Sequence, residues 1–301
     1  MSTARALVAR PPGHFLTFLM VSAYPAGVHS QVAKPGLCCR TAGACESVHP
    51  GPFSPRRDGR LSRVAHDRGY RRTFPPNEAC HPMKAKRGSQ KWLQVAVNEY
   101  PDVLDRAIRD TAGLAPSTSI EWLSPLAAED YVEYRDRAFL NRLGTQLRQR
   151  ELFSFWPPRG PMWDGLARTS DGELLLIEAK AHIAEMVSPA SRASASSRME
   201  IEKALAETRK ALAPRTTVSW SGTFYQFTNR LAHLYLLRTL NRKPARLVFI
   251  YFIGDDDMGG PTTREEWEGA IKVTEVYLGL GRHKLSRFVH HVFVDVNELR
   301  A

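Results

Sequence analysis

Residues 163–180 read WDGLARTSDGELLLIEAK and predict a β-hairpin whose second strand ends in charge. The aliphatic run 174–177 indicates a buried strand, and Ser-Asp-Gly before it is typical of a turn. Side chains on a strand alternate between two faces, so Glu178 and Lys180 point the same way. A strand that is otherwise apolar therefore ends in two opposite charges on one face, which requires an explanation.

The length of the hairpin loop decides where Asp164 points. A two-residue turn of Asp171 and Gly172 pairs Asp164 with Ala179 and places its carboxylate on the face opposite Glu178. A three-residue loop that also includes Ser170 pairs Asp164 with Glu178, with Cβ atoms roughly 4.5–5.5 Å apart. The sequence leaves both registers open. In the second, two neighbouring carboxylates could hold one divalent cation, with an amine beside them.

The spacing of these residues resembles the PD-(D/E)XK nuclease superfamily, the fold of many restriction and repair endonucleases. Asp164 is followed by thirteen residues and then by Glu178-Ala179-Lys180 at the end of an apolar strand. One departure is that proline stands at position 161 and not directly before the aspartate. The resemblance covers about residues 127–296, whose expected elements loosely follow the αβββαβ order of that core.

The resemblance implies a catalytic and metal-binding role for each residue of the motif. Asp164 and Glu178 would ligate Mg²⁺ or Mn²⁺ together with the Ala179 carbonyl, and Lys180 would orient or deprotonate the attacking water. The reaction would be hydrolysis of phosphodiester bonds. Superfamily members often add an acid from the helix before the hairpin, and Glu133 or Glu129 could serve, although both are also ordinary residues for a solvated helix.

A polar stripe on the helix expected over 224–240 is the second candidate for contact with a substrate. Gln226, Asn229, Arg230 and His233 recur at helical spacing on one face, opposite the apolar residues of that helix. Such a stripe could contact phosphates or base edges, or it could be a solvated face. Some superfamily members carry Gln and Tyr four residues apart on this helix, whereas Arg230 stands four residues after Gln226 here.

The order of the expected elements predicts an α/β fold, restriction-endonuclease-like, with a mixed sheet of four or five strands flanked by helices. Apolar periodicity indicates helices over 89–100, 101–108, 127–143, 199–212, 224–240 and 264–278, strands over 163–169, 173–181, 246–253 and 288–296, and a short extended segment over 120–126. The resemblance calls for a third strand in the opening meander, which we expect at 153–156 or within 218–223.

The first 82 residues differ in composition from the rest of the chain. They contain all four cysteines, half of the 20 prolines, 11 of the 42 Lys and Arg residues and 4 of the 31 Asp and Glu residues. We expect a disordered or misassigned N-terminal extension over 1–82, and a nuclease-like domain over 83–301 with a helical lead-in at 83–126 and a catalytic core at 127–301. The apolar stretch 15–24 resembles a secretory signal but is too short to span a bilayer.

The missing motifs exclude several other enzyme classes. The sequence has no Gly-rich phosphate loop, no GxSxG and no HExxH, which argues against a nucleotide triphosphatase, an α/β hydrolase and a zincin. The sequence thus favours a cytoplasmic, metal-dependent DNA nuclease that does not act at a membrane and for which a homodimer is allowed. The alternative is a catalytically inactive protein of the same fold that binds nucleic acid or a protein partner.

Overall fold

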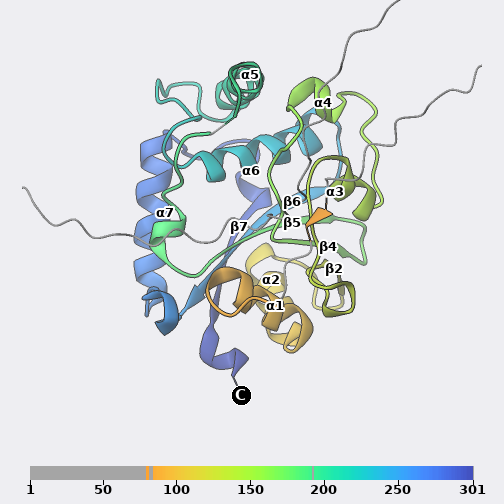
Figure 1. The fold of residues 1–301 in the computed structure, drawn as a ribbon, viewed down its shortest axis with the longest axis vertical. Coiled ribbons are helices and arrows are strands. Elements are labelled where there is room, and N and C mark those ends of the chain that lie inside the picture. The colour runs from red at the N-terminus through yellow and green to blue at the C-terminus, as the bar shows by residue number, and fades with distance from the viewer. Residues whose placement is uncertain (1–78, 81–83, 192, 301) are drawn as a thin grey trace, which may run out of the picture. The chain divides into compact units, whose positions relative to one another are not determined.

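The computed structural model describes residues 79–80, 84–191 and 193–300 of the chain. Its centre is a five-stranded sheet in which the strands lie side by side in chain order, as Figure 1 shows. The first three strands are antiparallel to one another and the last three are parallel. The strands are β2 (Ile120–Ser124), β4 (Gly165–Thr169), β5 (Leu174–Lys180), β6 (Ala245–Ile253) and β7 (Val289–Asp295). The predicted mixed α/β sheet is confirmed.

The hairpin of β4 and β5 has the register with the three-residue loop. Gly165 lies opposite Ile177, and at the loop the N–H of Thr169 donates to the carbonyl of Glu173 at 2.9 Å. Gly172 closes the loop in the left-handed conformation, with φ of 82°, which glycine adopts without steric cost. The same register continued by one residue places Asp164 opposite Glu178.

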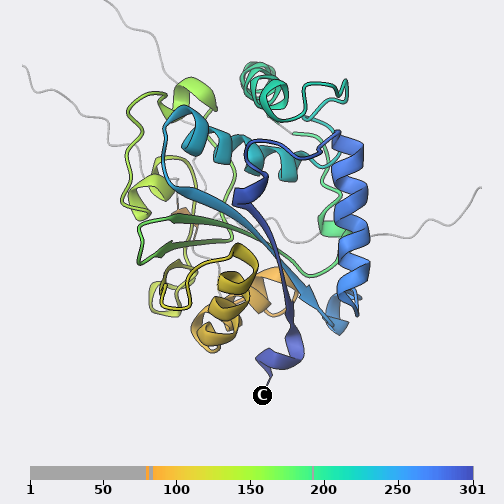
Figure 2. The same cartoon turned by 180° about the vertical axis from the view of Figure 1, so that it is seen from behind.

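Helices cover both faces of the sheet (Figures 1 and 2). One face packs on α1 (Gly88–Asn98) and α2 (Pro101–Ala112), which meet the odd-numbered side chains of β5 such as Leu175 and Ile177. The other face is covered by a larger set of helices that meets Leu174 and Leu176. This set comprises α3 (Asp136–Arg142), α4 (Leu152–Phe155), α5 (Ala195–Leu212), α6 (Tyr225–Tyr235, extended by a π-helical turn over Leu236–Leu240) and α7 (Arg264–Leu278).

The helix predicted over 127–143 is wrong in its first half. Ala127–Glu129 form a single 3₁₀ turn, and β3 (Glu133–Tyr134) then pairs with β1 (Ala79–Cys80), so that α3 begins only at Asp136. The backbone has positive φ at Asp130, Tyr131 and Asp136, with values of 52–57°. A right-handed helix cannot continue through such residues, which apolar spacing alone does not reveal.

The third strand of the meander was also misplaced. Residues 153–156 belong to α4 and its C-terminal end, and residues 218–223 contain no strand. The third strand is β2, which pairs antiparallel with β4. The extended segment at 120–126 had been expected, but its partner had not, because pairing between distant segments leaves no local signal in the sequence.

Ahead of the N-terminal boundary predicted at residue 83, β1 at Ala79–Cys80 pairs with β3. The rest of the expectation for residues 1–82 lies outside the described residues. In the described part of the chain, none of the helices combines the length and the apolar character that crossing a membrane requires.

Candidate active site

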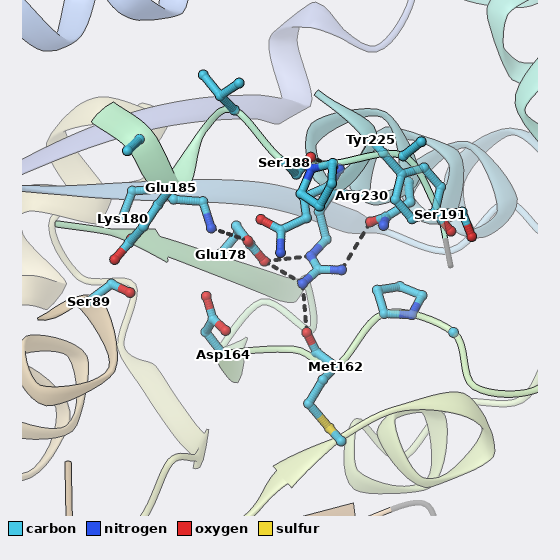
Figure 3. A pocket seen from close by; sticks show the side chains of 18 of the residues that line it. Ser89, Met162, Asp164, Glu178, Lys180, Glu185, Ser188, Ser191, Tyr225 and Arg230 are labelled. Carbon is cyan, nitrogen blue, oxygen red and sulfur yellow. Dashed lines mark hydrogen bonds and ion pairs between the residues drawn. The ribbon is translucent and has the colours of Figure 1, made fainter. Parts of the chain in front are cut away.

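The carboxyl end of β5 opens into a cleft of about 660 Å³. Asp164, Glu178 and Lys180 line it together, as predicted, and Figure 3 shows the three side chains around the same space. The remaining walls come from the start of α1, the segment 159–162, the loop 184–191 and the first turns of α6. Asp164 stands directly before β4 and Glu178 lies near the end of β5, and the two charges interact, so the fold brings two carboxylates together.

Glu178 is the centre of the ionic contacts in the cleft. Its Oε1 accepts a hydrogen bond from Lys180 Nζ, and its Oε2 accepts one from Arg230 Nε at 2.6 Å. The side chain is only 2% exposed. Burial alone would raise the pKa of Glu178, but Arg230 and Lys180 outweigh it and hold the pKa below the ordinary value. Glu178 is therefore a carboxylate at neutral pH.

Lys180 keeps its charge although it is buried. Burial would lower the pKa of its ammonium group, yet the nearby carboxylates of Glu178 and Asp164 raise it above the ordinary value. A protonated Lys180 can donate hydrogen bonds to a water or to a phosphate oxygen. It can also stabilise negative charge that develops in the cleft.

Burial and repulsion between carboxylates raise the pKa of both Asp164 and Glu133, the other two acids of this region. Asp164 Oδ2 accepts a hydrogen bond from the N–H of Ala179 at 2.8 Å, and burial followed by repulsion from Glu178 raises its pKa to about 7. Glu133 accepts a hydrogen bond from Gln90 at 2.9 Å, and burial followed by repulsion from Asp164 raises its pKa to about 8. A cation at Asp164 would relieve this repulsion.

The donor chemistry fits a hard divalent cation held by two carboxylates. Among the described residues, no three His, Cys, Asp or Glu side chains gather closely enough to hold one ion. An ion between Asp164 and Glu178 would therefore complete its shell with water, substrate or main-chain oxygens, as Mg²⁺ commonly does. The Ala179 side chain is packed on the opposite face of the sheet, and the role of its carbonyl stays a prediction.

Three of the four residues of the polar stripe on α6 lie in the cleft, and the fourth lies in the core. Gln226, Asn229 and Arg230 line the cleft, whereas His233 does not. His233 is 1% exposed and packs against the rings of Trp156 and Trp163. Burial lowers the pKa of His233 to about 3, so it is a neutral core residue whose Nδ1 hydrogen-bonds the carbonyl of Asn229.

The two candidate additional acids, Glu129 and Glu133, have different surroundings in the structure. Glu129 accepts a hydrogen bond from Arg142 Nη2 at 2.6 Å and another from the Tyr134 hydroxyl at 3.3 Å, and it does not line the cleft. Glu133 does not line the cleft either, but it interacts electrostatically with Asp164 and Glu178. It lies on β3 and not on the helix from which the resemblance would take this residue.

Several residues near the site had no signal in the sequence. Gln90 on α1 orients Glu133, and Ser188 accepts a hydrogen bond from the N–H of Gln226 at 2.8 Å, which joins the loop 184–191 to the start of α6. Arg230 was expected to contact substrate, but its contact with Glu178 was not foreseen. These contacts depend on how distant elements pack, and no local motif encodes them.

Comparison with known proteins identifies no relative of this chain. No family model, no curated protein and no solved structure matches it. The function must therefore be argued from the geometry and chemistry of the cleft.

Proposed function

We propose that this protein is a Mg²⁺- or Mn²⁺-dependent nuclease that hydrolyses phosphodiester bonds in DNA. The observation that carries the proposal is the register of the β4–β5 hairpin. Its pairing of Gly165 with Ile177, continued by one residue, would set Asp164 opposite Glu178, and both acids line an open cleft with Lys180. This is the arrangement that the resemblance to PD-(D/E)XK nucleases requires, and the register with the two-residue turn would have removed it.

The order of elements supports the same proposal. The chain runs from the helices α1 and α2 to β2, then through an insertion of β3, α3 and α4 to the antiparallel strands β4 and β5, the helices α5 and α6 and the parallel strand β6. This follows the αβββαβ order of the nuclease core more closely than the sequence alone suggested, because β2 supplies the strand that had been misplaced.

The residues of the cleft have separate tasks in this reaction. A divalent ion held by Asp164 and Glu178 supplies Lewis-acid stabilisation of the phosphate and a more acidic water. Lys180 orients the attacking water and stabilises the negative charge that builds on the phosphate oxygens. Gln226 and Asn229, on the wall formed by α6, are placed to contact the sugar-phosphate chain. In the reaction the water oxygen would form a bond to phosphorus and release one proton, one P–O ester bond would break, and the leaving oxygen would take up one proton, so that protons balance.

One observation favours a second candidate, a protein of this fold that binds nucleic acid or a protein partner without cutting. Both oxygens of Glu178 already accept hydrogen bonds from cationic side chains, Oε1 from Lys180 and Oε2 from Arg230. If these ion pairs persist with ligand bound, they leave Glu178 fewer lone pairs and less net charge for a metal, which favours binding without cleavage.

Cleavage of labelled single- and double-stranded DNA with and without Mg²⁺ or Mn²⁺ separates the two candidates. We expect metal-dependent cleavage by the wild type and a loss of at least about 100-fold in Lys180→Ala and Asp164→Asn, in the range of one lost catalytic group. Lys210→Ala on α5, outside the cleft, is the matched control and should cut normally. Equal cleavage by all variants would defeat the proposal, and binding without cleavage would favour the second candidate.

A further inference from the structure

The Arg230 side chain is fixed by contacts within the protein, although it lines the cleft. Its Nε donates to Glu178 Oε2, its Nη2 donates to the carbonyl of Met162 at 2.7 Å, and its Nη1 donates to Asn229 Oδ1 at 3.0 Å. The guanidinium carbon lies 4.8 Å from the ring centroid of Trp163. Figure 3 shows this side chain reaching from α6 across to Glu178 and Met162. Arg230 thus ties α6 to the hairpin that carries both proposed metal ligands.

The contacts of Arg230 place a fixed positive charge beside the proposed metal position. Together with Lys180, Arg230 donates to Glu178, so two cations already contact the carboxylate that would bind the metal. The contacts with Met162 and Asn229 do not involve Glu178 and can hold the guanidinium when Glu178 binds another cation. Arg230 is 5% exposed, so water screens its charge weakly.

We propose that Arg230 is a positioning residue that makes metal binding depend on bound nucleic acid. This inference rests on the proposed nuclease function and deepens it. Arg230 competes with the ion for Glu178 and repels it, so the free protein binds a divalent cation weakly. A phosphate in the cleft is attracted by Arg230, Lys180 and the ion together, so the phosphate and the ion bind cooperatively. The protein then assembles its reactive centre only on substrate.

The test measures Mn²⁺ binding and not cleavage. Mn²⁺ affinity is determined by electron paramagnetic resonance or calorimetry, alone and with a phosphorothioate oligonucleotide in single- and double-stranded form. We expect Arg230→Gln to bind Mn²⁺ at least about tenfold more tightly than the wild type without DNA, because a nearby buried positive charge is removed. We also expect DNA to increase the affinity of the wild type by a larger factor than that of Arg230→Gln.

Two further variants separate charge from general damage. Arg230→Lys keeps the charge and should bind Mn²⁺ like the wild type without DNA, which preserves the test if Arg230→Gln does not fold. Arg238→Gln removes an arginine that lies just after α6, stacks on Phe288 and pairs with Glu173, and it should change neither affinity. Its position outside the cleft makes it the matched control.

The outcomes distinguish this inference from the proposed function. Equal Mn²⁺ affinity of the wild type, Arg230→Gln and Arg230→Lys, or equal enhancement by DNA in all three, would overturn the role of Arg230 and leave the nuclease proposal intact. Absence of Mn²⁺ binding in every variant, with and without DNA, would overturn the nuclease proposal itself.

Discussion

At the scale of single residues, Glu178 is the side chain on which the stability of the site depends most. It is buried between two cations, and removing one partner of a buried ionic cluster leaves the others uncompensated. We predict that Glu178→Gln lowers the free energy of unfolding by about 3 kcal/mol. Denaturant unfolding measures this, with Glu268→Gln in the exposed Arg264–Glu268 pair as the control, for which we expect a change of less than about 0.5 kcal/mol. Equal effects of the two substitutions would show that the buried cluster is not intact in solution.

His233 predicts a pH dependence of stability. Its pKa of about 3 in the folded protein lies below the ordinary value of 6.5, so the unfolded chain binds the extra proton first as the pH falls. Stability from His233 is therefore present above pH 6.5 and is lost as the pH falls toward 3. Between pH 7.5 and 5 the wild type should lose about 2 kcal/mol more than His233→Gln. Parallel stability curves for the two proteins would contradict the buried, neutral state of this histidine.

Individual residues of the site differ in how far the sequence could predict their positions. Asp164, Glu178 and Lys180 were found from one hairpin because strand alternation and loop length fix their relative positions locally. Arg230 and His233 share a helical stripe in the sequence, but one lies in the cleft and the other in the aromatic core. Their difference arises from the packing of α6 against Trp156 and Trp163, which helical spacing does not encode.

At the scale of elements, the β4–β5 loop fixes the register on which the site depends. Gly172 has φ of 82°, where a Cβ is strained even though no atom lies within 4 Å of its position. We predict that Gly172→Ala lowers the free energy of unfolding by about 1 kcal/mol. Gly269, within α7, also has free space around it but has helical backbone, so Gly269→Ala should raise stability by about 0.5–1 kcal/mol. Opposite signs for the two substitutions are the expected result, and a loss of stability in both would contradict it.

Elements with sustained apolar periodicity were predicted well, and those defined by backbone conformation were not. The strand β6, buried along nearly its whole length, and the helix α7, with its Thr263–Glu266 capping box, were located within a residue or two. The segment 127–135 was misread as helix, because its apolar spacing matches a helix while Asp130 and Tyr131 adopt positive φ. Tyrosine rarely adopts positive φ, so the residue type at position 131 did not predict this conformation.

At the scale of the whole described domain, β5 and β6 join two hydrophobic clusters. Leu176 packs toward α6 and its neighbours, and Ile250 packs toward α1 and α2. Because the same central strands contribute to both clusters, the domain should unfold in one transition. Leu176→Ala and Ile250→Ala should each cost about 2–5 kcal/mol while far-UV circular dichroism and tryptophan fluorescence still report a single midpoint. Separate midpoints for the two probes would mean that the two layers fold independently.

The proposed nuclease requires Asp164 and Glu178 to share one divalent cation across the hairpin. Anomalous diffraction from crystals grown with Mn²⁺ and a phosphorothioate oligonucleotide locates such an ion. We expect a manganese peak that bridges a carboxylate oxygen of Asp164 and one of Glu178, at about 2.0–2.6 Å from each. A cleft that contains the oligonucleotide but no manganese at saturating Mn²⁺, or a peak bound by neither acid, would contradict it.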